Sequence, residues 1–101
     1  MDKQAKLQTL LEELLGSRNV YYQPPANLMM QYPAIRYSLS DIEIKYADNR
    51  SYSNLTRYEL TVIDYLPDNI VVQKILDLPL SSFDRRYTSD GLVHDVINLY
   101  F

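Results

Sequence analysis

The sequence predicts one α+β domain, residues 1–101, with two helices and a mostly antiparallel sheet of about five to six strands. Three observations predict this class. Leucines near the N-terminus have helical spacing, several later stretches alternate apolar and polar residues, and a second helical segment precedes a C-terminal hairpin pattern. Because 101 residues bury one modest core, we expect a single domain.

The first helix is expected over residues 3–15. Its apolar positions follow the i, i+3, i+4, i+7, i+8 spacing of one helical face: Leu7, Leu10, Leu11, Leu14 and Leu15. Gly16 can then adopt the left-handed conformation that ends many helices. We expect this leucine stripe to pack on the sheet of its own subunit. The alternative is a surface that docks into a partner's groove.

The next segment is unusually rich in tyrosine and proline. Residues 20–23 predict a short strand that ends at Pro24 and Pro25, and residues 26–31 predict a loop or a single helical turn. From Pro33, apolar and polar residues alternate to residue 39. A bend is expected at Ser40-Asp41, before a second alternating stretch over residues 42–46.

The middle of the chain predicts a loop, a strand and a helix. The polar stretch Asp48–Asn54 predicts an exposed loop, and residues 57–65 predict a longer strand. Residues 70–78 predict the second helix, with Asp68 as its N-cap and Pro79 beyond its end.

The C-terminal part predicts a hairpin. Residues 83–88 and 93–101 form its arms, and Asp90-Gly91 suits the positive φ angles of a tight turn. Val93, Ile97, Leu99 and Phe101 lie on one face if Asp95 sits near a bulge or the edge of the sheet. We expect this hairpin to be structural.

Composition argues against several classes of protein. The net charge is −3, and the nearest approach to a basic cluster is Arg85-Arg86, so specific nucleic-acid binding is not expected. The chain has no cysteine, which excludes disulfides and thiolate metal sites. We find no secretion signal and no apolar run of membrane-spanning length, so no membrane contact is expected.

Catalytic signatures are also missing. The single histidine, His94, has Asp95 beside it, but neighbours in a strand point to opposite faces and form no ready dyad. With two glycines in the chain there is no glycine-rich phosphate loop. We therefore expect no enzyme, no catalytic, cofactor-binding or metal site, and no cofactor. A small enzyme that uses carboxylates is the less favoured alternative.

Several short stretches from Val20 onward occur in a familiar order: VYYQPP, YPAIRY, KYADNRSY, RYELTVIDYLPD, SSFDRRYTSDGLVHDV and LYF. In the content and order of these stretches, the chain resembles a family of small tailed-bacteriophage neck proteins, which act in head–tail joining and tail completion. The order of helix, sheet, helix and hairpin is also similar to the fold of tail terminators.

The resemblance implies a structural virion protein without a cofactor. It implies a homo-oligomeric ring, taken as a hexamer, that terminates the tail tube and joins it to the head. Its partners are other copies of itself and the tail-tube and neck or connector proteins. It would be assembled in the host bacterial cytoplasm and located in the virion tail or neck. The alternatives are a head-side connector or minor capsid protein, or a monomeric protein-binding adaptor.

The resemblance also implies positions that recur in the family, namely Tyr22, Gln23, Pro24, Pro25, Tyr32, Pro33, Asp48, Asn49, Phe83, Asp84, Asp90, His94 and Asp95. Residues 21–37 either hold subunit contacts at fixed angles or wrap the domain's own core. The candidate interface residues are Tyr21, Tyr22, Gln23, Pro24, Pro25, Tyr32, Asp48, Asn49, Arg50, Tyr52, Arg85 and Arg86.

Overall fold

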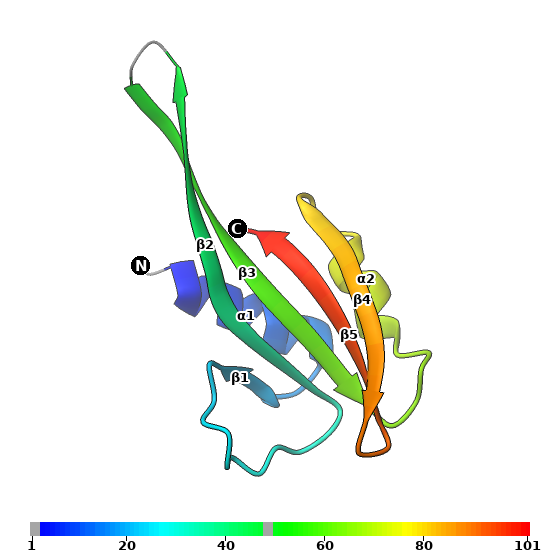
Figure 1. Cartoon of the computed structure of the whole chain (residues 1–101). Coiled ribbons are helices and arrows are strands. Elements are labelled where there is room, and N and C mark those ends of the chain that lie inside the picture. Colours follow the sequence, from blue (N-terminus) through cyan, green and yellow to red (C-terminus); the bar gives the residue numbers. More distant parts are fainter. Residues whose placement is uncertain (1–2, 48–49) are drawn as a thin grey trace.

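The computed structural model describes residues 3–47 and 50–101, with side chains described for residues 3–40 and 56–101. The predicted α+β class is confirmed, with the second helix between strands and a hairpin at the C-terminus (Figure 1). The elements in chain order are α1 (Lys3–Leu15), β1 (Val20–Tyr22), β2 (Ala34–Ala47), β3 (Arg50–Asp64), α2 (Ile70–Leu76), β4 (Ser81–Ser89) and β5 (Leu92–Tyr100).

The described strands form one five-stranded sheet in the order β1-β2-β3-β5-β4. Strand β1 runs parallel to β2, and the remaining neighbours are antiparallel. Both helices lie on the same side of this sheet (Figure 1). We call that side the helix face and the opposite side the outer face.

The hydrophobic core lies between the helix face and the two helices. From α1, Leu7 and Leu11 are fully buried, so the prediction that the leucine stripe packs within its own subunit is confirmed. Helix α2 adds Val71 and Ile75. The strands contribute alternate residues, because side chains two apart share a sheet face: Val20, Ile35, Tyr37, Tyr58, Leu60, Val62, Ile97 and Leu99.

Strands β2 and β3 continue as a two-stranded arm beyond the rest of the sheet. Their pairing runs to Ala47 and Arg50, whereas β5 pairs with β3 from Arg57 onward. We call residues 41–47 and 50–56 the arm. It gives the molecule its elongated dimensions of 50 × 23 × 23 Å (Figure 1).

The arm overturns two expectations from the sequence. The bend predicted at Ser40-Asp41 is a register shift inside one continuous strand, because β3 supplies hydrogen-bonding partners on both sides of it. The loop predicted at Asp48–Asn54 was also mostly wrong. Residues 50–54 belong to β3, since antiparallel pairing satisfies the backbone of polar residues as well as apolar ones. Asp48 and Asn49 lie outside the described residues.

Helix α2 begins and ends differently from the prediction. Its N-cap is Asn69, whose side-chain oxygen accepts a hydrogen bond from the Val71 N–H at 2.8 Å, so the assignment of Asp68 was wrong. The Asn69 side-chain amide also donates to Asp64 at 2.7 Å, which ties the helix start to the end of β3. The helix ends at Leu76, two residues before the predicted end at Leu78.

The C-terminal hairpin is confirmed. Asp90 and Gly91 both have positive φ, 53° and 74°, as a two-residue hairpin turn requires. Strand β5 is mostly buried, whereas β4 is an exposed edge strand. The bulge lies in β4, where a register shift between Phe83 and Arg85 leaves Asp84 without a paired residue.

Candidate interaction site

A small pocket opens on the outer face beside the β1 edge of the sheet. It has a volume of about 290 Å³. Its walls come from β2, β3 and the segment that leaves β1, and they consist of Gln23, Pro24, Arg36, Tyr37, Ser38, Glu59 and Thr61. We call it the β2–β3 pocket.

Two opposite charges in this pocket have no ion-pair or side-chain hydrogen-bond partner among the described residues. Arg36 is paired in register with Thr61, and Ser38 with Glu59, so Arg36 and Glu59 are diagonal neighbours on the outer face. Both side chains are half-buried. Neither makes an ion pair or a side-chain hydrogen bond with any described residue. The pocket is therefore suited to a group that brings a negative charge to Arg36 and a positive charge to Glu59.

The wall formed by Gln23 is fixed by hydrogen bonds. Gln23 adopts a positive φ of 44°, and its backbone N–H donates to the Tyr37 carbonyl at 2.8 Å. Its side-chain oxygen accepts a hydrogen bond from the Leu39 N–H at 3.1 Å. Because both bonds join the segment after β1 to β2, the pocket is preformed within one subunit.

The tyrosine- and proline-rich segment makes many contacts within its own subunit. The Tyr21 hydroxyl accepts a hydrogen bond from the Gln31 N–H at 3.2 Å. The Tyr22 ring lies 4.9 Å from that of Tyr37, and Tyr32 meets Tyr65 edge-to-face at 6.0 Å. Pro25 is exposed, and its carbonyl accepts a hydrogen bond from the Leu28 N–H. These contacts support the interpretation that the segment wraps its own domain.

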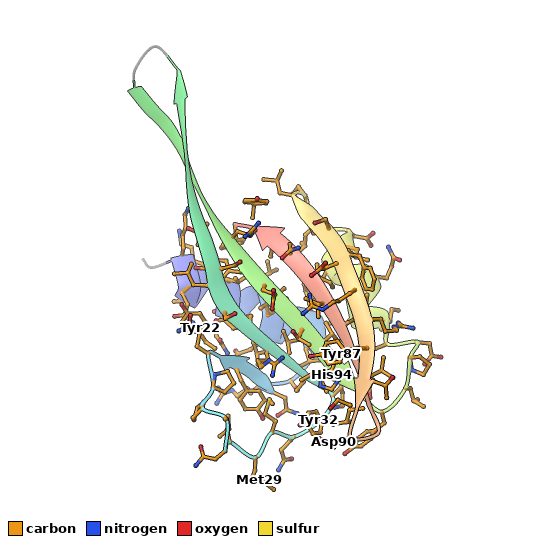
Figure 2. All side chains as sticks on the ribbon, viewed as in Figure 1. Tyr22, Met29, Tyr32, Tyr87, Asp90 and His94 are labelled. Atoms are coloured by element: carbon orange, nitrogen blue, oxygen red, sulfur yellow. The ribbon has the colours of Figure 1, made fainter. Side chains whose placement is uncertain are left out.

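The same segment also presents an exposed apolar tip. Met29 is 89% exposed and Leu28 is 40% exposed at the end of the loop (Figure 2). The two interpretations of residues 21–37 are therefore compatible, because its aromatic rings pack inward while the tip is left uncovered.

Tyr37 links the pocket strand to helix α1. Its hydroxyl donates to the Gln8 side-chain oxygen at 2.6 Å and accepts from the Gln4 amide at 2.7 Å. Burial raises the pKa of Tyr37 above its ordinary value. The phenol therefore stays neutral and serves as a structural bridge between sheet and helix.

The adjacent arginines of β4 have different roles, although the sequence suggested both as interface residues. Arg86 donates to both carboxylate oxygens of Asp95, which is 2% exposed, and to the Pro67 carbonyl at 2.7 Å. Asp95 is its cross-strand neighbour in β5. The Arg86 guanidinium neutralises a buried carboxylate, while its side chain is 45% exposed, and the interface role of Arg86 stays a prediction.

Arg85 and Asp84, in contrast, form a pair at the exposed edge of the sheet. Their side chains are 55% and 38% exposed, and the charged groups contact each other directly. The Arg85 guanidinium also lies 5.9 Å from the centre of the Tyr87 ring. This pair is accessible to a partner, and the bulge at Asp84 turns it away from regular strand pairing.

We predict different effects for the two arginines. Arg86→Ala should lower the melting temperature clearly, because it leaves the buried Asp95 carboxylate without its counter-ion. The matched control is Arg85→Ala in the next position, which should leave the melting temperature nearly unchanged, since exposed ion pairs contribute little. Thermal denaturation followed by circular dichroism measures both. Equal losses would show that the buried pair has no special structural role.

His94 lies on the outer face of the sheet. Its ring stacks on Tyr87 with centres 4.6 Å apart and planes 12° apart (Figure 2), and Nδ1 lies 3.1 Å from the Leu92 carbonyl oxygen. Asp95 instead binds Arg86 on the helix face. The expectation that His94 and Asp95 form no dyad is confirmed.

Other candidates stand as follows. Asp48 and Asn49 lie outside the described residues, and Arg50 and Tyr52 belong to the arm through their backbones.

Within residues 3–40 and 56–101, no group of three or more histidine, cysteine or acidic residues could hold a metal ion. No helix in the described ranges is long and apolar enough to cross a membrane.

Comparison with protein families, with curated proteins and with solved structures gives no match to this chain. The function of this chain is therefore inferred from the geometry of the subunit itself.

Sequence reasoning missed the charged pair of the pocket. In the sequence, Arg36 and Glu59 are ordinary polar positions of two alternating strands, 23 residues apart. They become neighbours only through the register of β2 against β3, which the bulge at Ser40 helps to set. A correct alignment of these two strands would have been the signal that found them.

Proposed function

We propose that this chain is a structural subunit of the bacteriophage head–tail junction, which assembles into a ring that terminates the tail tube and joins it to the head. The resemblance of its sequence stretches to small neck proteins supports this function. The observation that carries the proposal is the two-stranded arm, which extends beyond the body of the subunit (Figure 1).

The arm is built in a way that favours contact with another chain. Isolated two-stranded ribbons are marginally stable in water, and a third strand or a covering layer normally supports them. In the described part of the chain, β5 stops pairing with β3 near Arg57, and neither helix reaches along the arm (Figure 1). The arm sequence nevertheless alternates Ile42, Ile44 and Tyr46 with Glu43 and Lys45.

Such alternation is typical of a strand with one face covered. Since no third strand or helix of the described elements lies along the arm, a neighbouring subunit or the tail tube is the natural source of a cover. An arm from each copy that packs on the next gives a repeating contact, and such head-to-tail contacts generate closed rings when the rotation between copies closes.

We predict that the arm can be removed without loss of folding. Replacing residues 43–55 by Asn-Gly should leave the melting temperature close to that of the parent, because β3 and β5 pair from Arg57 onward and the core residues of the described side chains belong to that body. The shortened chain should sediment as a monomer under conditions in which the parent forms a ring, and it should fail to join heads to tails in a complementation assay.

Circular dichroism is the control for folding in this experiment. A shortened chain that still assembles, or that supports normal infectious particles, would contradict the proposed role of the arm. A parent that remains monomeric alone and with tail-tube and connector proteins would contradict the proposed function and favour a monomeric adaptor.

A further inference from the structure

The β2–β3 pocket offers two opposite charges to an occupant. Arg36 can bind an anion and Glu59 a cation, and the two are diagonal neighbours on one sheet face. The volume of about 290 Å³ is at the small end of ligand pockets, which usually run from about 300 to 1,000 Å³. A pair of protein side chains fits these requirements better than a cofactor-sized molecule.

The same subunit carries a matching pair. Asp84 and Arg85 are consecutive, exposed and of opposite sign, and they lie on the edge strand β4. The register shift at Asp84 interrupts regular pairing there, so the edge is better suited to presenting side chains than to adding another strand.

The two sites lie towards opposite edges of the sheet. In the order β1-β2-β3-β5-β4, the pocket is on β2 and β3 next to the short β1 edge, and the Asp84–Arg85 pair is on the far edge. Complementary patches near opposite edges of one subunit cannot satisfy each other within that subunit. They can bind between copies in a head-to-tail arrangement, in which each copy uses both patches.

We propose that Asp84 and Arg85 of one copy dock in the β2–β3 pocket of the next, with Asp84 facing Arg36 and Arg85 facing Glu59. This inference rests on the proposed ring. It identifies the contact that fixes the head-to-tail orientation of neighbouring copies. The four charges then alternate in sign across the contact. Such complementarity selects the correct orientation of the partner, because the reversed pairing places like charges together.

Neighbouring residues suit this contact. Ser38 and Thr61 lie beside the two charges and add hydroxyl groups that can bond to an incoming carboxylate or guanidinium. Gln23 and Pro24 close one side of the pocket, and the hydrogen bonds of Gln23 hold that side in place before the partner arrives. A preformed pocket loses less conformational freedom on binding.

The test uses exchanges of charge that leave the net charge unchanged. One double variant is R36E/E59R, which reverses the pocket. The second is D84R/R85D, which reverses the edge pair. The quadruple variant combines them and restores opposite signs across the contact. Melting temperatures show that each variant folds, and sedimentation velocity gives the dissociation constant of the assembly.

Each double variant should weaken assembly by roughly tenfold or more, and the quadruple variant should return to within about threefold of the parent. Recovery in the quadruple variant is the decisive result, because a merely structural effect of four substitutions would not reverse. If the parent forms rings and the double variants assemble equally well, or the quadruple variant is as weak as they are, the docking contact is overturned while the proposed ring stands.

Disulfide cross-linking between cysteine variants is a second measurement, which also detects weak contacts. Because the natural chain has no cysteine, every disulfide in a mixture of R36C and D84C chains joins two chains through the introduced cysteines, and the proposed contact favours the mixed pair. The control mixture is T9C with D84C, since Thr9 is exposed on α1. A several-fold higher yield of mixed dimer from the first pair supports the contact. Equal yields, together with a monomeric parent, overturn both the contact and the ring.

Discussion

Deleting Leu99, Tyr100 and Phe101 is expected to lower the free energy of unfolding by about 4 kcal/mol or more. Leu99 belongs to the core and is 1% exposed. Phe101 packs against the core from outside. Removing one large buried side chain typically costs about 2–5 kcal/mol, and this change removes one such side chain and most of a second. Because a small domain has a total stability of about 5–15 kcal/mol, much of the population should be unfolded.

The deletion also removes backbone hydrogen bonds that close the sheet. The Tyr100 N–H donates to the Leu80 carbonyl at 3.0 Å, and the Phe101 N–H donates to the Thr56 carbonyl at 2.9 Å. Urea denaturation of the deleted and full chains measures the loss directly. An unchanged midpoint would show that the end of β5 contributes little to the core.

His94→Ala is the matched comparison within the same strand. It removes a stacked ring from the outer face, and such aromatic pairs contribute about 0.5–1.5 kcal/mol. We expect a loss of that size and normal particle assembly. A His94→Ala chain that folds fully but abolishes assembly would make His94 part of an interface.

The second large effect is expected from Leu11→Ala. Leu11 has no exposed surface, and it lies in the core with Leu7 and the buried residues of the sheet. The substitution should therefore lower the free energy of unfolding by about 2–5 kcal/mol through lost burial and the cavity left behind. Thermal and urea denaturation would show this as a lower midpoint.

Glu13→Ala provides the control on the same helix. Glu13 is exposed on the opposite side of α1 and should change stability by less than about 0.5 kcal/mol. If Leu11→Ala behaved like this control, α1 would be held loosely and its leucines would be available to a partner.

Periodicity predicted the parts of the fold that depend on burial. The leucines of α1 and the alternating core residues of β3 and β5 pack on one face of each element, and they repeat in the sequence with a clear period. The turn at Asp90-Gly91 was predictable for a different reason, because few residue pairs tolerate two consecutive positive φ angles.

Features that depend on pairing were not predictable from composition. Ser40 and residues 50–54 look like breaks in the sequence, but each lies where β2 and β3 continue to bond to each other. The N-cap of α2 was misassigned because Asp68 and Asn69 are both good capping residues. The hydrogen bond from Asn69 to Asp64, a contact between two elements, distinguishes them in the structure.

Only half of the candidate site followed from the sequence. The turn residues Gln23 and Pro24 and the pair at Arg85-Arg86 stand out through their chemistry. Arg36 and Glu59 do not, because their position side by side depends on the register of two strands. Nothing in the sequence indicates that Arg86 bonds to a buried carboxylate, since Asp95 lies opposite it only through the pairing of β4 with β5.

The position of β5 in the sheet also determines when this protein can fold during synthesis. Strand β5 lies between β3 and β4, although it is made after both. Until the ribosome has released it, β4 has no partner strand and one side of β3 remains open. The contacts that join β3 to β5 are also distant in sequence, which slows their formation. The growing chain therefore exposes apolar strand surface until β5 has left the ribosome, and only then can its sheet close.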